Sequence, residues 1–264
     1  MKEFEGHYLF VDGAYLDKVL ASYADRFYQG KAIEIDYRRI IGGHERCFYY
    51  DCPVQKKSNQ SKAAFQEDVQ IQLEKFQKIA STKGVHLFTG QLRGRDSRIR
   101  QKGIDVKMAV DMFSHAIRKN MTHATLLSGD LDFYPIVDAL VDHGIFVTLY
   151  CDKKSASQDL IRAADDKQFF SPWSIFRWIS KSMTNPPIEP IKRKLILLPN
   201  IPVIKTGSRF DGKKVYAYRQ PDGYSIAYPQ GASGDYCEIR HPDFDIALNF
   251  VELEIDSVSW NESE

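Results

Sequence analysis

The stretch ATLLSGDLDFYPIVDAL, residues 124–140, begins with an uncharged run and ends with a largely apolar one, and two acids, Asp130 and Asp132, lie between the two runs. Residues 124–127 have the composition of a strand that is buried on both faces of a parallel sheet. Residues 133–143 carry apolar side chains at spacings of three and four, which predicts a helix. A strand followed directly by a helix is the repeating unit of an α/β fold. Asp130 and Asp132 lie at the junction, where two like charges repel each other and are costly to bury.

The same alternation extends outward through the first 180 residues. It predicts a parallel sheet covered by helices on both faces, in a doubly wound, Rossmann-like arrangement. The pattern leaves the strand order open, although the first strand of such folds commonly lies near the centre. Further strands are predicted over 8–11, 47–50, 85–88, 145–150 and 168–170, and further helices over 14–27, 65–80, 106–117, 156–164 and 173–181.

The helix over 106–117 has a continuous apolar face, which we expect to be buried against the sheet. Asp111 lies roughly opposite Asp105 on the helical wheel and is expected to be a solvated charge. The expected buried face consists of Val106, Ala109, Val110, Phe113 and Ile117.

The composition changes at TNPPIEPIKRK, residues 184–194, where three prolines and a basic cluster predict an extended linker. We therefore expect an α/β domain over 1–183, a linker over 184–194 and a small β-rich domain over 195–264. Its expected strands include LILL, VYAY, YSIAY, YCEIR and IALNFVELEI, and Asp-Gly pairs at 211–212 and 222–223 predict hairpins. The role of this domain is open, and a protein partner is one expectation.

Composition and charge narrow the class of protein. The 264 residues are 43% hydrophobic and 27% charged, as in an ordinary soluble globular protein. A net charge of +1 means that any attraction for nucleic acid must come from a local patch. Apolar runs are too short to span a bilayer and the first residues lack a signal-peptide pattern, so we expect a cytoplasmic protein without a membrane partner. The four cysteines lack zinc-site spacing and are expected to be free thiols.

Acidic side chains follow the predicted strands where a parallel sheet binds ligands. Asp12 follows the first strand, Asp130 and Asp132 follow the fourth, and Asp105 opens a helix. Parallel sheets bind ligands beyond the carboxyl ends of their strands, where the strand order reverses. If the first and fourth strands are neighbours there, these carboxylates face one crevice.

Such a group of carboxylates needs a proton or a cation, because like charges about 4 Å apart repel by about 4 kcal/mol at an effective dielectric constant near 20. Oxygen ligands without His or Cys suit Mg²⁺ or Mn²⁺, which can support hydrolysis of a phosphodiester. Each acid also has a structural interpretation. Asp132 or Asp105 could cap a helix, and Asp12 could begin a turn. Asp130 has the least structural explanation, because Gly129 and Asp132 already account for the turn and the cap.

A basic segment, RGRDSRIRQKGID, leads from the third strand to Asp105. It is either a solvated loop or the part of the protein that holds the phosphates of a nucleic acid. Ser128 could contact a phosphate or begin a turn. The candidate substrate-binding side chains are Arg93, Arg95, Arg98, Arg100, Lys102, Lys107 and Ser128.

Four stretches resemble the NYN family of PIN-like nucleases, in its LabA-like branch. They are LFVDGAYL, QKGIDVKMAVDM, LLSGDLDFYPIVDALVDHGIFVTLY and LIRAADDKQFFS. The resemblance implies a Rossmann-like PIN fold, divalent-metal-dependent endoribonuclease chemistry, pairing into a homodimer, and metal-site roles for Asp12, Asp105, Asp130 and Asp132. Many family members place Asn shortly after the first Asp, whereas this sequence reads Gly13-Ala14-Tyr15.

Three functions remain open from the sequence. The leading hypothesis is a metal-dependent nuclease that hydrolyses RNA rather than DNA, with Mg²⁺ or Mn²⁺ held by the four aspartates. The alternative is a non-catalytic RNA-binding or adaptor protein that uses its C-terminal domain for partners, which the missing Asn favours. A third, weaker interpretation is an aspartyl phosphoacceptor, although no acidic pair follows the first strand.

Overall fold

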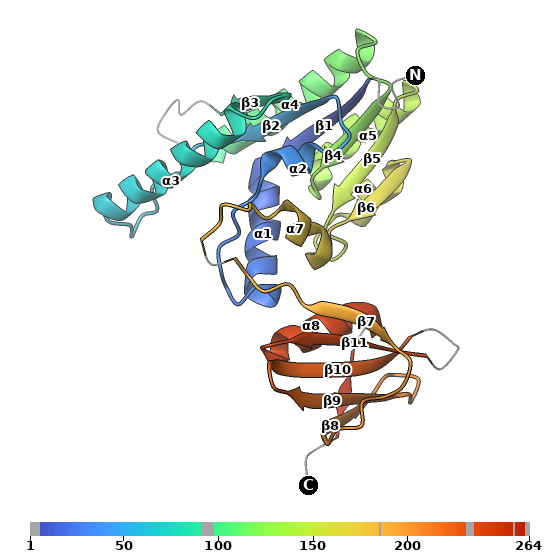
Figure 1. The fold of residues 1–264 in the computed structure, drawn as a ribbon. Helices are drawn as coiled ribbons and strands as arrows, with labels where there is room; N and C mark the ends of the chain where they lie inside the picture. Colours follow the sequence, from blue (N-terminus) through green and yellow to red (C-terminus); the bar gives the residue numbers. More distant parts are fainter. Residues whose placement is uncertain (1–5, 91–97, 185, 231–234, 256, 262–264) are drawn as a thin grey trace. The chain divides into compact units, whose positions relative to one another are not determined.

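The computed structural model describes residues 6–90, 98–184, 186–230, 235–255 and 257–261, with side chains left out for 98–102 (Figure 1). The chain divides into two compact units, which we describe one at a time. Unit 1 consists of Met1–Leu20 and Glu34–Lys181, and unit 2 consists of Ala21–Ile33 and Ser182–Glu264.

Unit 1 contains a six-stranded parallel sheet with the order β3-β2-β1-β4-β5-β6, which confirms the predicted α/β class. The strand order places the first strand beside the fourth, at the centre of the sheet. The strands are β1 (His7–Asp12), β2 (Arg46–Asp51), β3 (Val85–Thr89), β4 (His123–Leu127), β5 (Phe146–Cys151) and β6 (Asp166–Phe169).

Helices cover both faces of this sheet, as right-handed crossovers in opposite directions from a central strand require. One face carries α4 (Arg98–Ile117), the short 3-10 helix η1 (Leu131–Phe133), α5 (Tyr134–Asp142) and α6 (Gln158–Ala163). Their buried side chains, such as Met108, Val137 and Leu160, form one core with Phe10 and Leu126 of the central strands. The remaining helices are α1 (Gly13–Phe27), α2 (Tyr37–Ile41), α3 (Lys62–Ala80) and α7 (Pro172–Trp178).

The predicted buried face of α4 is wrong. The side chains that enter the core lie four residues apart along a second stripe, Ile104, Met108, Met112 and Ala116, each at most 8% exposed. The expected stripe is largely exposed, with Val106 at 62%, Val110 at 55%, Phe113 at 38% and Ile117 at 54%. Both stripes are apolar, so periodicity alone does not select one. Unbranched methionines fill the irregular space above the sheet, where branched side chains are stiffer.

Asp111 is also not the solvated charge that the sequence predicts. Its side chain is 18% exposed, accepts a hydrogen bond from the Tyr50 hydroxyl at 2.8 Å and pairs with Lys107 Nζ at 2.5 Å. Asp111 therefore links α4 to the end of β2.

Unit 2 contains a six-stranded antiparallel sheet with the order β12-β8-β9-β10-β11-β7. The two Asp-Gly pairs lie in the turns between β8 and β9 and between β9 and β10, as predicted, with Gly212 and Gly223 at positive φ. The strands are β7 (Ile191–Leu195), β8 (Val203–Ser208), β9 (Lys214–Gln220), β10 (Gly223–Gln230), β11 (Asp235–His241) and β12 (Ser259–Trp260).

Two predicted strands of unit 2 are wrong. LILL, residues 195–198, contributes only its first residue to a strand, because β7 begins at Ile191, inside the predicted linker. IALNFVELEI lies in the helix α8 (Phe244–Ile255). Its buried side chains, Ile246, Ala247, Phe250, Val251 and Ile255, recur at spacings of one, three and four, which is a helical period. The helix packs against β10 and β11. Phe27, near the end of α1, belongs to the same unit and lies 5.1 Å from Phe250 between ring centroids.

None of the described helices combines the length and the apolar composition needed to cross a membrane.

Candidate functional site

The candidate site lies at the carboxyl ends of β1 and β4, where the strand order of the sheet reverses. Val11 of β1 is paired with Leu127 of β4, so the residues after each strand emerge side by side. The chain continues from β1 into α1, and from β4 into η1 and α5. In open parallel sheets this reversal point is where ligands bind.

Asp12 ends β1 and uses both carboxylate oxygens to contact the rest of the site. Oδ1 accepts a hydrogen bond from the Tyr15 backbone N–H at 3.0 Å, and Oδ2 accepts one from the Ser128 hydroxyl at 3.0 Å. Burial raises the pKa of Asp12, and these two hydrogen bonds oppose that rise because they favour the ionised form. Asp12 is thus a fixed carboxylate in a partly dehydrated position.

Ser128 follows β4 and joins two of the predicted site acids. It is fully buried, and its hydroxyl oxygen also lies 3.3 Å from the backbone nitrogen of Asp130, which donates to it. The Ser128 side chain therefore links the Asp12 carboxylate to the backbone of Asp130. The predicted phosphate contact would need an exposed hydroxyl, so the geometry favours this bracing role.

Asp130, rather than Asp132, caps the turn after β4. Its Oδ1 accepts a hydrogen bond from the Asp132 N–H at 3.0 Å at the start of η1, whereas α5 begins without a side-chain cap. The cap predicted at Asp132 is two residues too late, because the short helix η1 precedes α5. Both side chains remain exposed to solvent.

Asp105 comes from α4, and its pKa reflects the charges of the other three acids. Its pKa is raised to about 6, first by burial and then by the charges of Asp12, Asp130 and Asp132. Lys18 of α1 opposes these effects. Carboxylates on two other segments therefore lie close enough to Asp105 for their charges to disfavour its ionisation.

The acids fit a divalent cation in the chemistry of their donors. All four are carboxylates, the ligands that Mg²⁺ and Mn²⁺ prefer, and a cation would relieve the repulsion that raises the pKa of Asp105. Their present spacing is wider than a coordination sphere. Within the part of the chain that the structure describes, no three His, Cys, Asp or Glu side chains are close enough together to hold a metal ion.

Comparison with known proteins assigns the domain. Residues 8–172, more than half of the chain, match the NYN domain. The chain belongs to the NYN family. This membership implies a PIN-like nuclease, and NYN nucleases typically use divalent metals. The LabA-like branch stays a prediction.

None of the curated proteins matches the chain. Among solved structures, the chain is similar to a protein of unknown function from Vibrio parahaemolyticus, at 18% identity and a TM-score of 0.44. The similarity covers 68% of this chain and 99% of that one.

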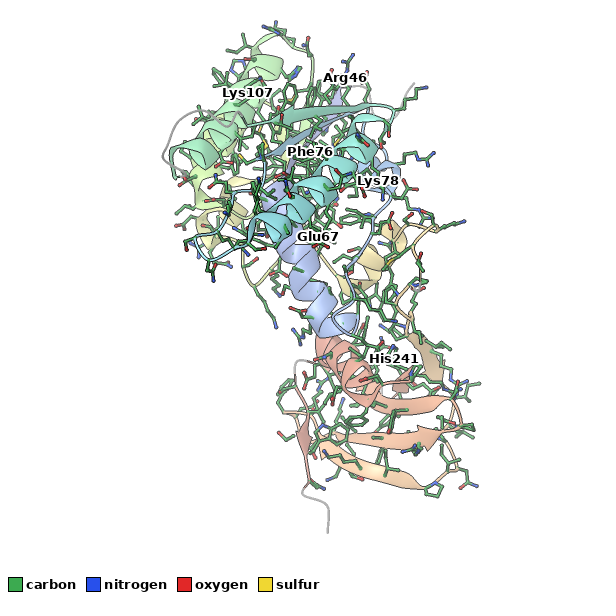
Figure 2. The ribbon with its side chains drawn as sticks, turned by 90° about the vertical axis from the view of Figure 1, so that its left-hand side faces the viewer. Arg46, Glu67, Phe76, Lys78, Lys107 and His241 are labelled. Carbon is green, nitrogen blue, oxygen red and sulfur yellow. The ribbon has the colours of Figure 1, made fainter. Side chains whose placement is uncertain are left out.

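The basic segment, residues 93–105, leads into the first turns of α4, and few of its side chains are among the described parts of the NYN domain. Arg93 and Arg95 fall in the undescribed stretch 91–97, and Arg98, Arg100 and Lys102 lie in the first turns of α4 without described side chains. Lys107, labelled in Figure 2, is described. Its ammonium group pairs with Asp111 and lies 4.7 Å from the centre of the Phe88 ring, so its charge is already engaged.

Tyr15 is a residue of the NYN site that the sequence analysis noted only as a departure from the family. Its ring packs against Gly129, where an added Cβ would come within 2.6 Å of the tyrosine oxygen. Its hydroxyl accepts a hydrogen bond at 2.9 Å from the N–H of Asp152, which follows β5. Tyr15 therefore ties the ends of β1, β4 and β5 together. Its position directly after the strand and the Asp-Gly pair was the available signal.

Asp51 is a further acid of this edge that the sequence analysis missed. It ends β2, is 5% exposed and pairs with Lys75 Nζ of α3 at 2.8 Å. A Cβ on Gly13 would lie 2.9 Å from its carboxylate, so Gly13 makes room for it. Asp51 directly follows the predicted strand CFYY, which was a usable signal. Lys75 Nζ also pairs with Asp17 at 2.6 Å, so one ammonium group is shared by two carboxylates and holds Asp51 as a structural part of the edge.

The thiol of Cys52 lies beside these acids. Its pKa is raised to about 11, first by burial and then by the charges of Asp51, Asp105 and Asp12. At neutral pH the thiol is therefore protonated, and it places a neutral group beside these acids.

Proposed function

We propose that this protein is a metal-dependent endoribonuclease. The observation that carries the proposal is that Asp12, Asp105, Asp130 and Asp132 gather at the strand reversal of an NYN domain, close enough for the other three charges to act on Asp105. The charges of Asp12, Asp130 and Asp132 add to the burial that raises the pKa of Asp105, and a divalent cation among these carboxylates would offset that repulsion. RNA is the proposed substrate, in line with the ribonuclease chemistry that the family resemblance implies.

Asp12, Asp105 and Asp130 are the proposed ligands of Mg²⁺ or Mn²⁺, with Asp132 as a fourth or outer ligand. When bound, such an ion would supply Lewis-acid activation of water and of the phosphodiester. The protein contributes the positions of these groups. Tyr15 and Ser128 fix Asp12, and Ser128 also fixes the backbone at Asp130.

The test is cleavage of single-stranded and structured RNA by the purified protein in Mn²⁺, in Mg²⁺ and in EDTA. We expect cleavage that EDTA abolishes and that an Asp12→Asn, Asp130→Asn double variant loses. Asp142→Asn, which removes an exposed carboxylate at the far end of α5, is the matched control and should cleave normally. Cleavage that survives EDTA or the double substitution would overturn the proposed mechanism.

A second candidate is an RNA-binding or adaptor protein without catalysis. Two observations favour it. Among the described residues no three His, Cys, Asp or Glu side chains are close enough together to hold a metal ion, and Gly13-Ala14-Tyr15 lacks the Asn that many family members place shortly after the first Asp. This function predicts RNA binding with no cleavage under any metal or substrate condition. Cleavage that depends on Asp12 and Asp130 would remove it.

A further inference from the structure

A groove is lined by η1, by the first turns of α5 and by α6. Its volume is about 730 Å³, within the usual range of ligand pockets. Leu131 of η1 lines the groove and lies between Asp130 and Asp132 in the sequence, so the groove adjoins the turn that carries these two acids. Its lining residues include Leu131, Tyr134, Pro135, Asp138, Asp159 and Arg162.

One part of the groove is apolar and open to solvent. Leu131 is 50% exposed and Tyr134 is 38% exposed, and Pro135 follows at the start of α5. Unpaired bases of RNA bind proteins by stacking on aromatic side chains and packing on apolar ones. Tyr134 offers such a ring a few residues from the proposed metal ligands.

The polar part of the groove is suited to a base rather than to a phosphate. Two carboxylates, Asp138 and Asp159, face one guanidinium, Arg162, so the charge disfavours an anion. Carboxylates accept hydrogen bonds from the exocyclic amino groups of bases, as they do from the amino group of cytosine. Arg162 pairs with Asp159 at 3.3 Å, is 75% exposed and has further N–H donors for a ribose or base oxygen.

We propose that this groove binds an unpaired, amino-bearing base of the RNA, adenine, cytosine or guanine rather than uracil, beside the scissile phosphate. The inference rests on the proposed nuclease function and adds a substrate class to it: single-stranded RNA with a base preference. Asp138 and Asp159 select the base, and Tyr134 and Leu131 provide the stacking surface.

The first experiment measures binding of fluorescent oligo(A), oligo(C) and oligo(U) RNA by anisotropy, and cleavage of the same RNAs in Mn²⁺. Tyr134→Ala should weaken binding of oligo(A) and oligo(C) by about tenfold and raise KM more than it lowers kcat. Tyr134→Phe keeps the ring and should behave as the unchanged protein. Phe146→Ala, an aromatic of similar exposure at the start of β5, is the matched control.

The second experiment tests the base preference with an Asp138→Ala, Asp159→Ala variant and Asp142→Ala as its control. The double variant should lose the preference for oligo(A) and oligo(C) over oligo(U), whereas the control should keep it.

The outcomes separate this inference from the proposed function. If RNA is cleaved but Tyr134→Ala and Phe146→Ala bind and cleave alike, the groove does not hold a base, and the nuclease proposal stands. The same result is expected if the groove instead accepts a basic side chain of a protein partner. If the unchanged protein cleaves no RNA, the proposed function fails and the inference fails with it.

Discussion

The position of Asp105 at the sheet edge lowers the stability of the metal-free protein at neutral pH, and this effect can be measured. The pKa of this carboxyl rises from 3.8 to about 6 in the folded protein, so without metal the folded state binds its proton more tightly than the unfolded chain does. The free energy of unfolding is therefore reduced as the pH rises from about 4 through 6. Asp105→Asn removes this penalty.

In EDTA at pH 7.5 we expect Asp105→Asn to be more stable than the unchanged protein, by on the order of 1 kcal/mol after solvent screening of a half-exposed group. At pH 4 the two should unfold alike. Thermal unfolding at both pH values measures this, with Asp142→Asn as the control. A lower unfolding temperature for Asp105→Asn at pH 7.5 would show that the acids do not crowd one another.

His7 lies at the start of β1, at the amino ends of the strands, and its effect on stability changes with pH in the opposite direction. Its Nε2 lies 2.9 Å from the Thr125 hydroxyl, which His44 also contacts at 3.0 Å. Burial, followed by the charges of His44 and His123, lowers the pKa of His7 to about 4. Because the unfolded chain takes up a proton near pH 6.5, this contribution to stability is present above that pH and is lost as the pH falls toward 4.

We therefore expect His7→Gln to flatten the loss of stability between pH 6.5 and 4. The measurement is the urea midpoint of unfolding at pH 7, 5.5 and 4.5 for the unchanged protein and the variant. Parallel curves for the two proteins would contradict the assignment to His7.

Some site residues can be predicted from sequence because their positions follow from topology. Asp12 and Asp130 directly follow predicted strands, and a parallel sheet brings such residues to one edge. Side-chain partners are harder to predict, because they depend on packing between distant segments. The buried hydroxyl of Ser128, the Asp51–Lys75 pair and the contact of Tyr15 with Asp152 all join residues more than 20 positions apart.

At the scale of elements, α4 shows what periodicity leaves undecided. The helix has two apolar stripes, and only the structure identifies the buried one. Where a segment has a single apolar face, as in residues 133–143, the sequence is sufficient. In α8 the apolar residues have a helical spacing, but they also form short apolar runs. Such runs predict a strand when the neighbouring segments of the domain form hairpins, and this is why the prediction is wrong.

A pair of substitutions tests the assignment of the α4 faces. Met108 is fully buried, so Met108→Ala should lower the free energy of unfolding by about 2–5 kcal/mol through lost packing and a cavity. Val110→Ala changes a 55% exposed side chain and should alter it by less than about 0.5 kcal/mol. Chemical unfolding compares them, and equal losses would show that the buried stripe is assigned incorrectly.

At the scale of the whole molecule, helix α1 contributes to both compact units. Its residues up to Leu20 belong to unit 1, and those from Ala21 belong to unit 2. The sequence predicts the change of composition at 184–194, but it contains no local sign that residues 21–33 pack with the C-terminal sheet. Such a partnership is non-local, and neither hydrophobic period nor turn residues encode it.

Two buried residues of α1 test this division. Phe27, 3% exposed, lies against Phe250, whereas Leu16 is fully buried in unit 1. We expect Phe27→Ala to reduce amide-exchange protection mainly in α8, β10 and β11, and Leu16→Ala to reduce it mainly in β1 and β4. Loss of protection in the same strands for both variants would contradict two separate units.

The discontinuous make-up of unit 2 also affects how the chain is synthesised. Residues 21–33 leave the ribosome about 150 residues before the segment that covers them, an interval of roughly 10–30 s at ordinary rates of translation. During that time Ala24 and Phe27, both buried in the finished protein, lack the contacts that the C-terminal segment provides, such as that of Phe27 with Phe250. The second half of α1 therefore exposes apolar side chains that a chaperone can cover until the C-terminal strands emerge.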